Sequence, residues 1–138
     1  MKPQKQNNFR KEALTQNLGV RYLYKKFHEE IKSNLTDGIS LEIGSGNSNY
    51  KDFDEVVITS DITYDERLDL VFDALNIPFK SNSISNIILF DVLHHLEKPL
   101  DFLNEARRVL RKHGRIVLVE PYVSPISWLI YKLFHDED

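Results

Sequence analysis

Residues 41–50, LEIGSGNSNY, constrain the fold of this chain more than any other segment. An apolar strand containing Glu42 leads into Gly44 and Gly46, which are separated only by Ser45. Two glycines this close allow the backbone to turn sharply and approach a ligand, because no Cβ intervenes. A strand, a glycine turn and the start of a helix form a common nucleotide-binding unit of α/β folds. The segment therefore predicts a cofactor-binding turn.

Short apolar segments of strand length recur along the chain. We predict strands at residues 39–43, 55–60, 69–72, 86–90 and 115–119. The fourth is apolar throughout, which is typical of a strand buried on both faces. Strands that alternate with helices or loops indicate an α/β fold with a Rossmann-like, doubly wound, mostly parallel sheet of about five strands.

Helical periodicity precedes the first strand. Apolar residues between Val20 and Ile31 recur at helical spacing, and Asp37-Gly38 is expected to end that helix. Two further helical segments are expected, at residues 47–53 and 126–133.

Another helix is predicted between the fourth and fifth strands. It begins at Pro99, which suits the first turn of a helix. We expect Leu103, Ala106 and Leu110 on its buried face and Gly114 as its C-terminal cap.

Acidic residues stand at or beside the predicted carboxyl ends of all five strands. They are Glu42, Asp61, Asp73, Asp91 and Glu120. In an open parallel sheet the ligand crevice lies outside the carboxyl ends of the strands. We therefore expect these acids along one edge of the sheet, although an acid after a strand can also simply cap the next segment.

Composition limits the function classes. The formal net charge is -3, so the chain lacks the basic surplus of a dedicated nucleic-acid binder. It has no cysteine, which excludes disulfides, thiolate catalysis and cysteine-ligated zinc. No apolar segment is long enough to span a bilayer, and residues 1–12 lack the apolar core of a signal peptide. We expect a single cytoplasmic domain over residues 1–138, with residues 1–12 flexible.

A dinucleotide site fits the glycine turn less well. The fingerprint G-x-G-x-x-G requires a third glycine and an acid about 20 residues further on. Asn49 occupies the third glycine position, and Asp61 lies closer than the fingerprint requires. NAD is therefore the weaker interpretation, and a Walker loop is excluded because no Gly-Lys-Ser/Thr follows.

The chain resembles class I S-adenosylmethionine-dependent methyltransferases of the type 11 group. Five segments match the family's motifs in the family's order and cover about residues 39–121. They are LEIGSGNS, the acid-containing ITSDI, Asp73-Ala74 followed by Ile77-Pro78-Phe79, NIILFDVLHHLEKP, and EARRVLRKHGRI. The resemblance implies a Rossmann-like fold with S-adenosylmethionine as the cofactor.

The resemblance also implies roles for the glycine turn. Gly44, Ser45 and Gly46 would let the backbone pass under the methionine and ribose portions of the cofactor. Glu42 would help to hold the amino-acid end.

On the adenosine side, the resemblance implies that Asp61 accepts hydrogen bonds from the ribose hydroxyls and that Ile62 packs on the adenine. Asp73 would accept from the adenine amino group, and Ala74 would be small enough to admit the ring. Phe90-Asp91 would line the side nearest the methionine and the substrate.

The chain departs from the family's pattern in three places. Ser48 replaces the last glycine of the turn, and the short segment between Asp61 and Asp73 leaves no room for the helix that the family usually has there. Family members also continue with two more strands after the fifth. We therefore expect a truncated version of a larger enzyme, in which residues 115–119 form an apolar edge open to pairing with a second copy.

Methyl transfer from a sulfonium is an in-line displacement, in which the protein mainly positions donor and acceptor. A base is needed only if the acceptor must lose a proton, and His94 and His95 are the candidates. Adjacent residues point in different directions, so we expect only one of the two in the cleft, the other capping the loop or being solvated. Asp91 and Glu120 are alternative polar contacts or simple caps. A metal held by Asp91, His94 and His95 is disfavoured, because the spacing matches no common ligand pattern, and we predict no metal site.

Three functions remain open from the sequence. The leading hypothesis is methyl transfer from S-adenosylmethionine to a small-molecule or lipid-like acceptor. The second is a non-catalytic cofactor-binding or interaction module, and the third is a nicotinamide-dependent oxidoreductase. The acceptor is not identified, because variable segments choose the substrate in this fold. No nucleic-acid partner and no stable membrane insertion are expected.

Overall fold

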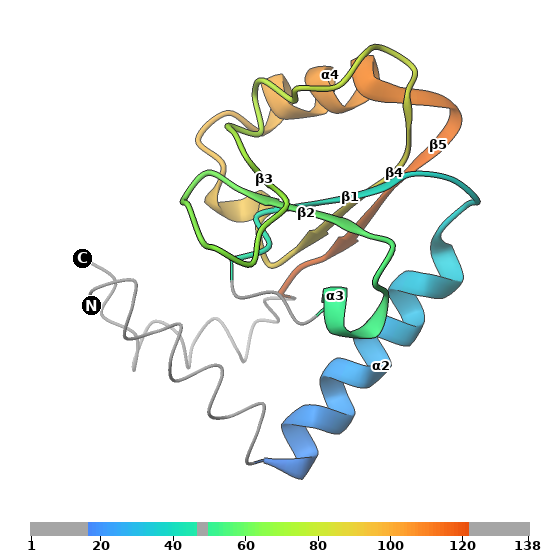
Figure 1. Cartoon of the computed structure of the whole chain (residues 1–138), viewed down its shortest axis with the longest axis vertical. Helices are drawn as coiled ribbons and strands as arrows, with labels where there is room; N and C mark the ends of the chain where they lie inside the picture. Colours follow the sequence, from blue (N-terminus) through green and yellow to red (C-terminus); the bar gives the residue numbers. More distant parts are fainter. Residues whose placement is uncertain (1–16, 47–49, 122–138) are drawn as a thin grey trace, which may run out of the picture.

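The computed structural model describes residues 17–46 and 50–121. The strands of these residues form one sheet in the order β3-β2-β1-β4-β5 (Figure 1). They are β1 Ser40–Ile43, β2 Ile58–Asp61, β3 Leu70–Val71, β4 Ile84–Phe90 and β5 Leu110–Val119. Neighbouring strands pair in parallel throughout. The predicted α/β fold with a parallel, Rossmann-like sheet is confirmed.

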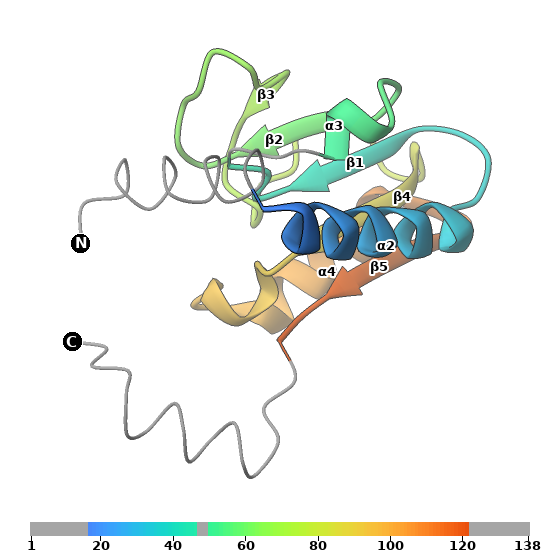
Figure 2. The ribbon, with the colours of Figure 1, turned by 90° about the horizontal axis from the view of Figure 1, so that it is seen from below.

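Helices cover both faces of the sheet. Helix α2 (Leu18–Asn34) and the short α3 (Tyr50–Phe53) lie on one face, and α4 (Pro99–Val109) lies on the other (Figures 1 and 2). A single 3-10 turn, η1 (Leu93–His95), follows β4. This layering is the doubly wound arrangement that the sequence predicted.

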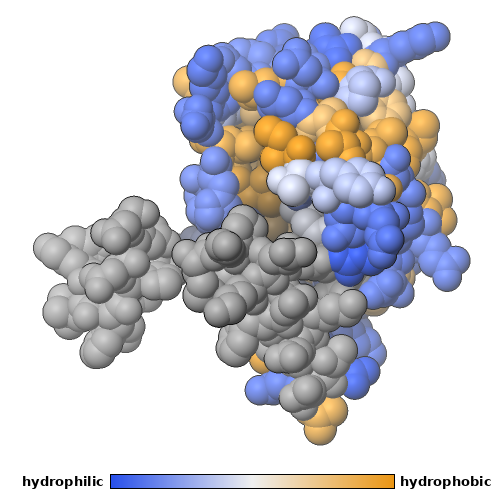
Figure 3. Space-filling model, turned by 60° about the vertical axis from the view of Figure 1, so that its left-hand side comes forward, coloured by the Kyte–Doolittle hydropathy of each residue, from blue (hydrophilic) through white to orange (hydrophobic). Residues whose placement is uncertain are grey.

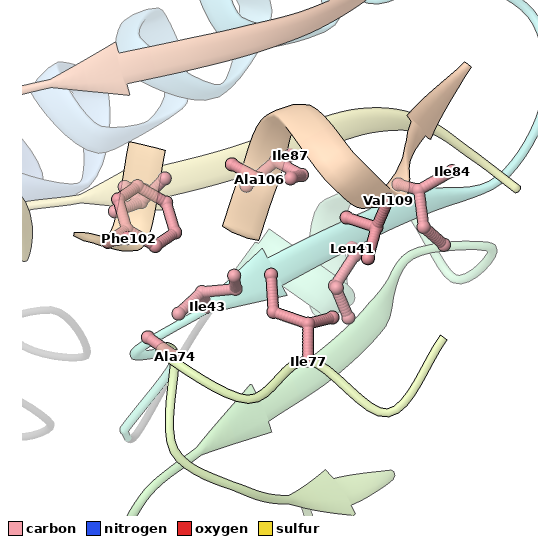
Figure 4. Close-up of a cluster of buried hydrophobic side chains, with 10 residues drawn as sticks. Leu41, Ile43, Ala74, Ile77, Ile84, Ile87, Phe102, Ala106 and Val109 are labelled. Carbon is pink, nitrogen blue, oxygen red and sulfur yellow. The ribbon is translucent and has the colours of Figure 1, made fainter. Parts of the chain in front are cut away.

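Strand β4 lies in the middle of the hydrophobic core. Its side chains alternate between the faces: Ile87 and Leu89 pack in the cluster with α4, whereas Ile88 packs in the cluster with α2 and α3. Figure 4 shows Phe102 and Ala106 of α4 facing the sheet across the first cluster. Burying a side chain of this size stabilises the fold by about 1.5–3 kcal/mol, which accounts for the apolar run from Ile87 to Phe90.

Helix α2 begins and ends for local reasons. The side chain of Asn17 accepts hydrogen bonds from the backbone N–H groups of Gly19 and Val20, which caps the N-terminus. The helix ends at Asn34, and Gly38, with a φ of 117°, turns the chain toward β1. The predicted breaker at Asp37-Gly38 therefore lies in the loop that follows the helix.

Strands β2, β3 and β4 differ at their ends from the predicted ranges. Residues 55–57 precede β2, because the N–H of Val57 donates to the carbonyl of Asp54 and closes a turn. The third strand is shorter than predicted, with only residues 70–71 in the ladder. Strand β4 begins at Ile84, two residues before the strand predicted at residues 86–90.

The buried face of α4 is also one residue away from its predicted position. Phe102, Ala106 and Val109 are fully buried, whereas Leu103 is 38% exposed. The helix ends at Val109, so the prediction of Leu110 on its buried face is wrong.

Gly114 is not the cap of α4. It lies within β5, in an irregular stretch where Ile84 pairs with Leu110 but Asn86 pairs with Arg115. His113, with a φ of 64°, takes the left-handed conformation that a capping glycine often adopts.

Residues 47–49, which include Ser48 and Asn49, and the predicted helix at 126–133 lie outside the described residues. Within residues 17–46 and 50–121, none of the helices has the length and apolar character needed to cross a membrane.

Candidate active site

A cleft of about 460 Å³ lies at the carboxyl ends of the strands. Six of the residues predicted from the sequence line it: Gly44, Asp61, Ile62, Asp73, Ala74 and His95. Figure 3 looks toward this edge and shows hydrophobic side chains gathered between hydrophilic areas. The structure therefore brings the turn after β1 and the ends of β2 and β3 together around one cavity.

Gly44 is required in the turn for two reasons. Its φ is +71°, a conformation that side chains disfavour, and a Cβ there would lie 2.6 Å from Cγ2 of Val92. Gly46 has a φ of +50°, but its Cβ would meet only Oδ2 of Asp61, at 3.9 Å. Close packing against Val92 therefore requires glycine at position 44, whereas at position 46 a Cβ would make only an ordinary van der Waals contact.

The carboxylate of Asp61 is fixed at the end of β2. Its Oδ2 accepts the N–H of Gly46 at 2.9 Å, and its Oδ1 accepts the N–H of Thr63 at 2.9 Å. Each carboxylate oxygen has two acceptor sites, so the side chain can accept further hydrogen bonds from a ligand in the cleft. This geometry suits the paired hydroxyls of a ribose.

The segment after β3 forms a tight turn beneath the cleft. Oδ1 of Asp73 accepts the N–H of Leu75 at 2.9 Å, and its backbone carbonyl accepts the N–H of Asn76 at 2.8 Å. Ala74 is buried, whereas Ile62, which also lines the cleft, is 70% exposed. A ligand in the cleft could cover part of the exposed Ile62.

A buried polar network holds the glycine turn to the sheet. The hydroxyl of Ser45 donates to Oε2 of Glu42 at 3.0 Å, and the hydroxyl of Ser60 donates to the carbonyl of Glu42 at 2.7 Å. The N–H of Ser45 donates to the carbonyl of Ser60 at 2.8 Å. Glu42 is 3% exposed, so its carboxylate serves mainly to fix the turn that Gly44 and Gly46 form.

Phe90 and Asp91 are not among the residues that line the described cleft. The ring of Phe90 stacks on Tyr24 at 5.4 Å and meets Phe27 edge-on at 5.6 Å, so it packs against α2. Asp91 has a φ of 60°, and its N–H donates to the carbonyl of Val119 at 2.7 Å. Asp91 therefore turns the chain at the end of β4 and ties it to the end of β5.

The two histidines take different positions. His95 lines the cleft, whereas Nδ1 of His94 lies 2.5 Å from Oε2 of Glu120. Their ring centroids are 4.0 Å apart. As the sequence predicted, only one of the pair lines the described cleft, because neighbouring residues in η1 point in different directions.

Glu120, predicted as a polar contact or a cap of the segment that follows it, instead holds the turn after β4. Its Oε1 accepts the N–H groups of Val92 and Leu93, at 3.1 and 2.7 Å. Partial burial raises the pKa of Glu120, but the hydrogen bonds from His94 and from these amides outweigh it and hold the pKa below its ordinary value. An acid after a strand is an ambiguous signal, since nothing in the sequence shows that its partner lies on the preceding loop.

Asp91, His94 and Glu120 each offer one possible metal-ligand atom, and these atoms lie within 4.8 Å of one another. This set differs from the one considered from the sequence, because Glu120 takes the place of His95. The hydrogen bonds between His94, Glu120 and the backbone account for the arrangement without an ion.

The chain matches the model of the family described as "Methyltransferase domain" over residues 41–118. Two uncharacterised proteins of Methanocaldococcus jannaschii are similar in sequence. One is 28% identical and aligns over 94% of this chain and 57% of its own length, and the other is 27% identical over 70% and 51%. The chain thus spans a little over half the length of these relatives.

Solved structures share the fold. An S-adenosylmethionine-dependent methyltransferase of Thermotoga maritima, described as a possible histamine N-methyltransferase, superposes with a TM-score of 0.75 at 21% identity, covering 94% of this chain and 65% of that one. A methyltransferase of Aquifex aeolicus that also depends on S-adenosylmethionine gives 0.59 at 19% identity, covering 99% and 87%. The cleft offers groups that would suit that cofactor: the fixed carboxylate of Asp61 and the apolar side chains of Ile62, Phe72 and Ala74. The chain belongs to the methyltransferase domain family, as a class I S-adenosylmethionine-dependent methyltransferase domain.

Proposed function

We propose that this domain transfers the methyl group of S-adenosylmethionine to a small-molecule acceptor, with lipid-like molecules within that class. The observation that carries the proposal is the carboxylate of Asp61, held by the amide of Gly46 at the mouth of a cleft that Gly44 and Ala74 also line. The family match over residues 41–118 supports the same cofactor.

The residues of the cleft would each hold one part of the cofactor. Asp61 would accept hydrogen bonds from the two ribose hydroxyls, and Asp73 would accept one from the adenine amino group. Ile62 would cover one face of the adenine. Gly44 and Gly46 leave room for the methionine portion to pass over the turn. When bound, the cofactor supplies both the methyl group and the leaving group, so the protein's part is to position the acceptor and to exclude water.

Binding can be tested by calorimetric titration of S-adenosylhomocysteine into the wild-type chain, Asp61→Ala and Asp37→Ala. We expect Asp61→Ala to bind at least about tenfold more weakly, because a charged hydrogen-bond acceptor contributes about 1.5–3 kcal/mol. Asp37 is exposed in the loop before β1, so Asp37→Ala is the matched control and should bind like wild type. Binding of NAD, but not of S-adenosylhomocysteine, to the wild-type protein would contradict the proposal.

Turnover is a separate measurement. Wild-type protein would be incubated with methyl-labelled S-adenosylmethionine and a panel of amines, phenols, thiols and fatty acids. Histamine belongs in the panel because the similar Thermotoga protein is described as a possible histamine N-methyltransferase. Cofactor binding without transfer to any of these classes would favour the non-catalytic module instead.

A further inference from the structure

Basic side chains gather at the amino end of the sheet, on the side of β4 and β5. Arg107 lies in the last turn of α4, and Arg111, Lys112 and Arg115 lie in the first part of β5. Lys80 stands in the loop before β4, whose backbone N–H groups donate to carbonyls at the end of α4. All of these side chains belong to exposed residues. We call this set the basic edge.

Two arginines extend the basic edge across both helix layers. The guanidinium of Arg111 donates to the backbone carbonyl of Asp37, in the loop before β1. Nη1 of Arg115 donates to the carbonyl of Asn34, at the end of α2, at 2.8 Å. Because α4 and α2 lie on opposite faces of the sheet, the basic edge runs from one helix layer to the other (Figure 1).

Neighbouring acids leave the charge of the basic edge largely uncompensated. Within residues 17–46 and 50–121, none of its members forms an ion pair with a carboxylate. Glu105 is engaged by Arg108 instead, at 2.7 and 2.8 Å. Asp37 is exposed, and Arg111 contacts its backbone carbonyl. Like charges held together in this way create a surface of positive potential.

The formal net charge of -3, which disfavours a nucleic-acid partner when it is taken over the whole chain, averages surfaces of opposite sign. The cleft at the carboxyl ends of the strands is lined by three carboxylates and one lysine, namely Asp61, Asp73, Glu97 and Lys98. The basic edge lies at the other end of the strands and carries the opposite charge. Whole-chain charge therefore does not exclude a polyanion at this edge.

The basic edge has few apolar side chains beside it. Of the large apolar side chains that are exposed in the described part of the chain, Ile39 is the one beside this edge; it is 46% exposed and its carbonyl accepts the N–H of Ser85. Protein interfaces usually have an apolar centre, and membrane-surface segments bury an apolar face. Basic charge without such an anchor is typical of contact with nucleic-acid phosphates. Binding of single strands also uses exposed aromatic rings, and the described residues place none here, which favours a duplex.

The loop before β4 favours RNA over DNA as the duplex. Ser81 and Asn82 are exposed beside Lys80, and Asn82 turns the loop with a φ of 59°. Their hydroxyl and amide groups are suited to hydrogen bonds with the 2′-hydroxyls that an RNA duplex displays in its minor groove.

We propose that the basic edge binds the phosphate backbone of double-stranded RNA, with Ser81 and Asn82 contacting ribose hydroxyls. The arginines donate to phosphate oxygens in pairs, and the lysines act as point charges. Because the cofactor cleft lies at the carboxyl ends of the strands, RNA and cofactor occupy separate surfaces. RNA binding at this edge is independent of methyl transfer.

The first experiment follows the fluorescence anisotropy of a labelled RNA duplex of about 20 base pairs as the wild-type chain is added. We expect a Kd of roughly 1–100 µM at about 150 mM salt. A plot of the logarithm of the binding constant against that of the salt concentration should have a slope of about -2 to -4, because each phosphate contact contributes about -0.9. A slope near zero, or no binding at about 50 mM salt, would overturn the proposal.

The second experiment reverses two charges of the basic edge by combining Arg107→Glu with Lys112→Glu. Both residues are exposed, so the fold should be unaffected, and RNA affinity should fall at least about tenfold. Arg21→Glu combined with Lys25→Glu, in the exposed first half of α2, changes the net charge equally and should bind RNA like wild type. Equal losses in the two double variants would mean that overall charge, rather than the basic edge, binds RNA.

A milder variant checks that lost binding does not come from lost folding. Lys80→Ala combined with Lys112→Ala adds no negative charge and should make the salt slope shallower by about 2. Thermal unfolding of all three double variants should match wild type. An unchanged slope in a folded alanine variant would contradict the phosphate contacts.

Competition separates RNA from other polyanions. The competitors are a DNA duplex of the same sequence, phosphatidylserine vesicles and polyglutamate, and RNA should bind more tightly than each. Tighter binding of DNA would overturn the choice of RNA, and tighter binding of vesicles or polyglutamate would assign the basic edge to a membrane or to an acidic protein.

Cofactor binding is measured in parallel. Affinity for S-adenosylhomocysteine should be equal with and without saturating RNA, and a marked loss in the presence of RNA would contradict the separate surfaces. Wild-type protein that binds RNA but not S-adenosylhomocysteine would contradict the proposed function alone and would support the RNA surface.

Discussion

At the scale of single residues, the site depends on a glycine that touches a valine. A Cβ on Gly44 would lie 2.6 Å from Cγ2 of Val92, and the backbone there has a φ of +71°. Any side chain at 44 therefore meets both a steric clash and an unfavourable conformation. The sequence motif indicates that Gly44 makes room for a ligand. The structure shows that the atoms nearest to a Cβ at this position belong to Val92.

We expect Gly44→Ala to lower the free energy of unfolding by about 3 kcal/mol, from backbone strain and overpacking together. Adding Val92→Ala removes the clash but not the strain. The double variant should therefore be more stable than the sum of the two single changes predicts, by about 1–2 kcal/mol. Urea denaturation of the four proteins measures this coupling, and strictly additive effects would contradict the close contact.

Glu120 should make stability depend on pH. Its pKa is held below the ordinary value of 4.5, so the folded state favours the ionised form. The stability that this contributes is complete above that value and is lost as the pH falls through the lower, folded-state pKa.

We therefore expect wild type to be more stable than Glu120→Gln near neutral pH, by about 1–2 kcal/mol. The difference should shrink toward zero as urea denaturation is followed from about pH 7 down to about pH 3. A difference that stays constant over this range would mean that the charge of Glu120 is not the cause.

At the scale of elements, α4 shows how a helical pattern can be assigned one residue off. Its segment, PLDFLNEARRV, contains apolar residues at adjacent positions 102 and 103. Ala106 lies on the buried face whether Phe102 or Leu103 faces the core, so the sequence alone does not decide between these two residues. The contact with β4 decides it: Phe102 packs in the cluster with Ile87 and Leu89, and Leu103 remains partly exposed.

The two neighbours should respond very differently to truncation. We expect Phe102→Ala to cost about 3–5 kcal/mol, because it removes a fully buried ring and leaves a cavity. Leu103→Ala should cost less than about 1 kcal/mol, since an exposed position loses little burial and alanine favours the helix. Thermal and urea unfolding measure both variants. Similar losses of unfolding free energy at the two positions would contradict the assignment of Phe102, rather than Leu103, to the buried face.

At the scale of the whole molecule, the sheet and the cleft can be predicted from the sequence more directly than the contact between Glu120 and His94. The acids after β2 and β3 reach the cleft because parallel strands end on one edge, which the alternation of elements already implies. The pairing of Glu120 with His94 joins two loops on neighbouring strands. It depends on strand order and on the turn at Asp91, neither of which a local pattern encodes.

The position of β5 at the edge of the described sheet bears on assembly. Within residues 17–46 and 50–121 no strand pairs with its outer side, and Leu118 on it is 42% exposed. We expect wild type to associate through this edge in light scattering after size exclusion, and Leu118→Lys to be monomeric, because a charge on an edge strand opposes pairing. Leu103→Lys, at a similarly exposed leucine on α4, should associate like wild type, and a monomeric wild-type chain would remove the edge from consideration.

The pairing of β1 with β4 determines when the cofactor turn can form during synthesis. All the residues of β2 and β3 separate these two strands in the chain, yet β4 supplies the ladder beside β1, and Val92 supplies the surface against Gly44. In a nascent chain the glycine segment therefore leaves the ribosome before β4 and Val92, two of the neighbours that it has in the folded domain. We therefore expect affinity for the cofactor to appear only after β4 and η1 have left the exit tunnel.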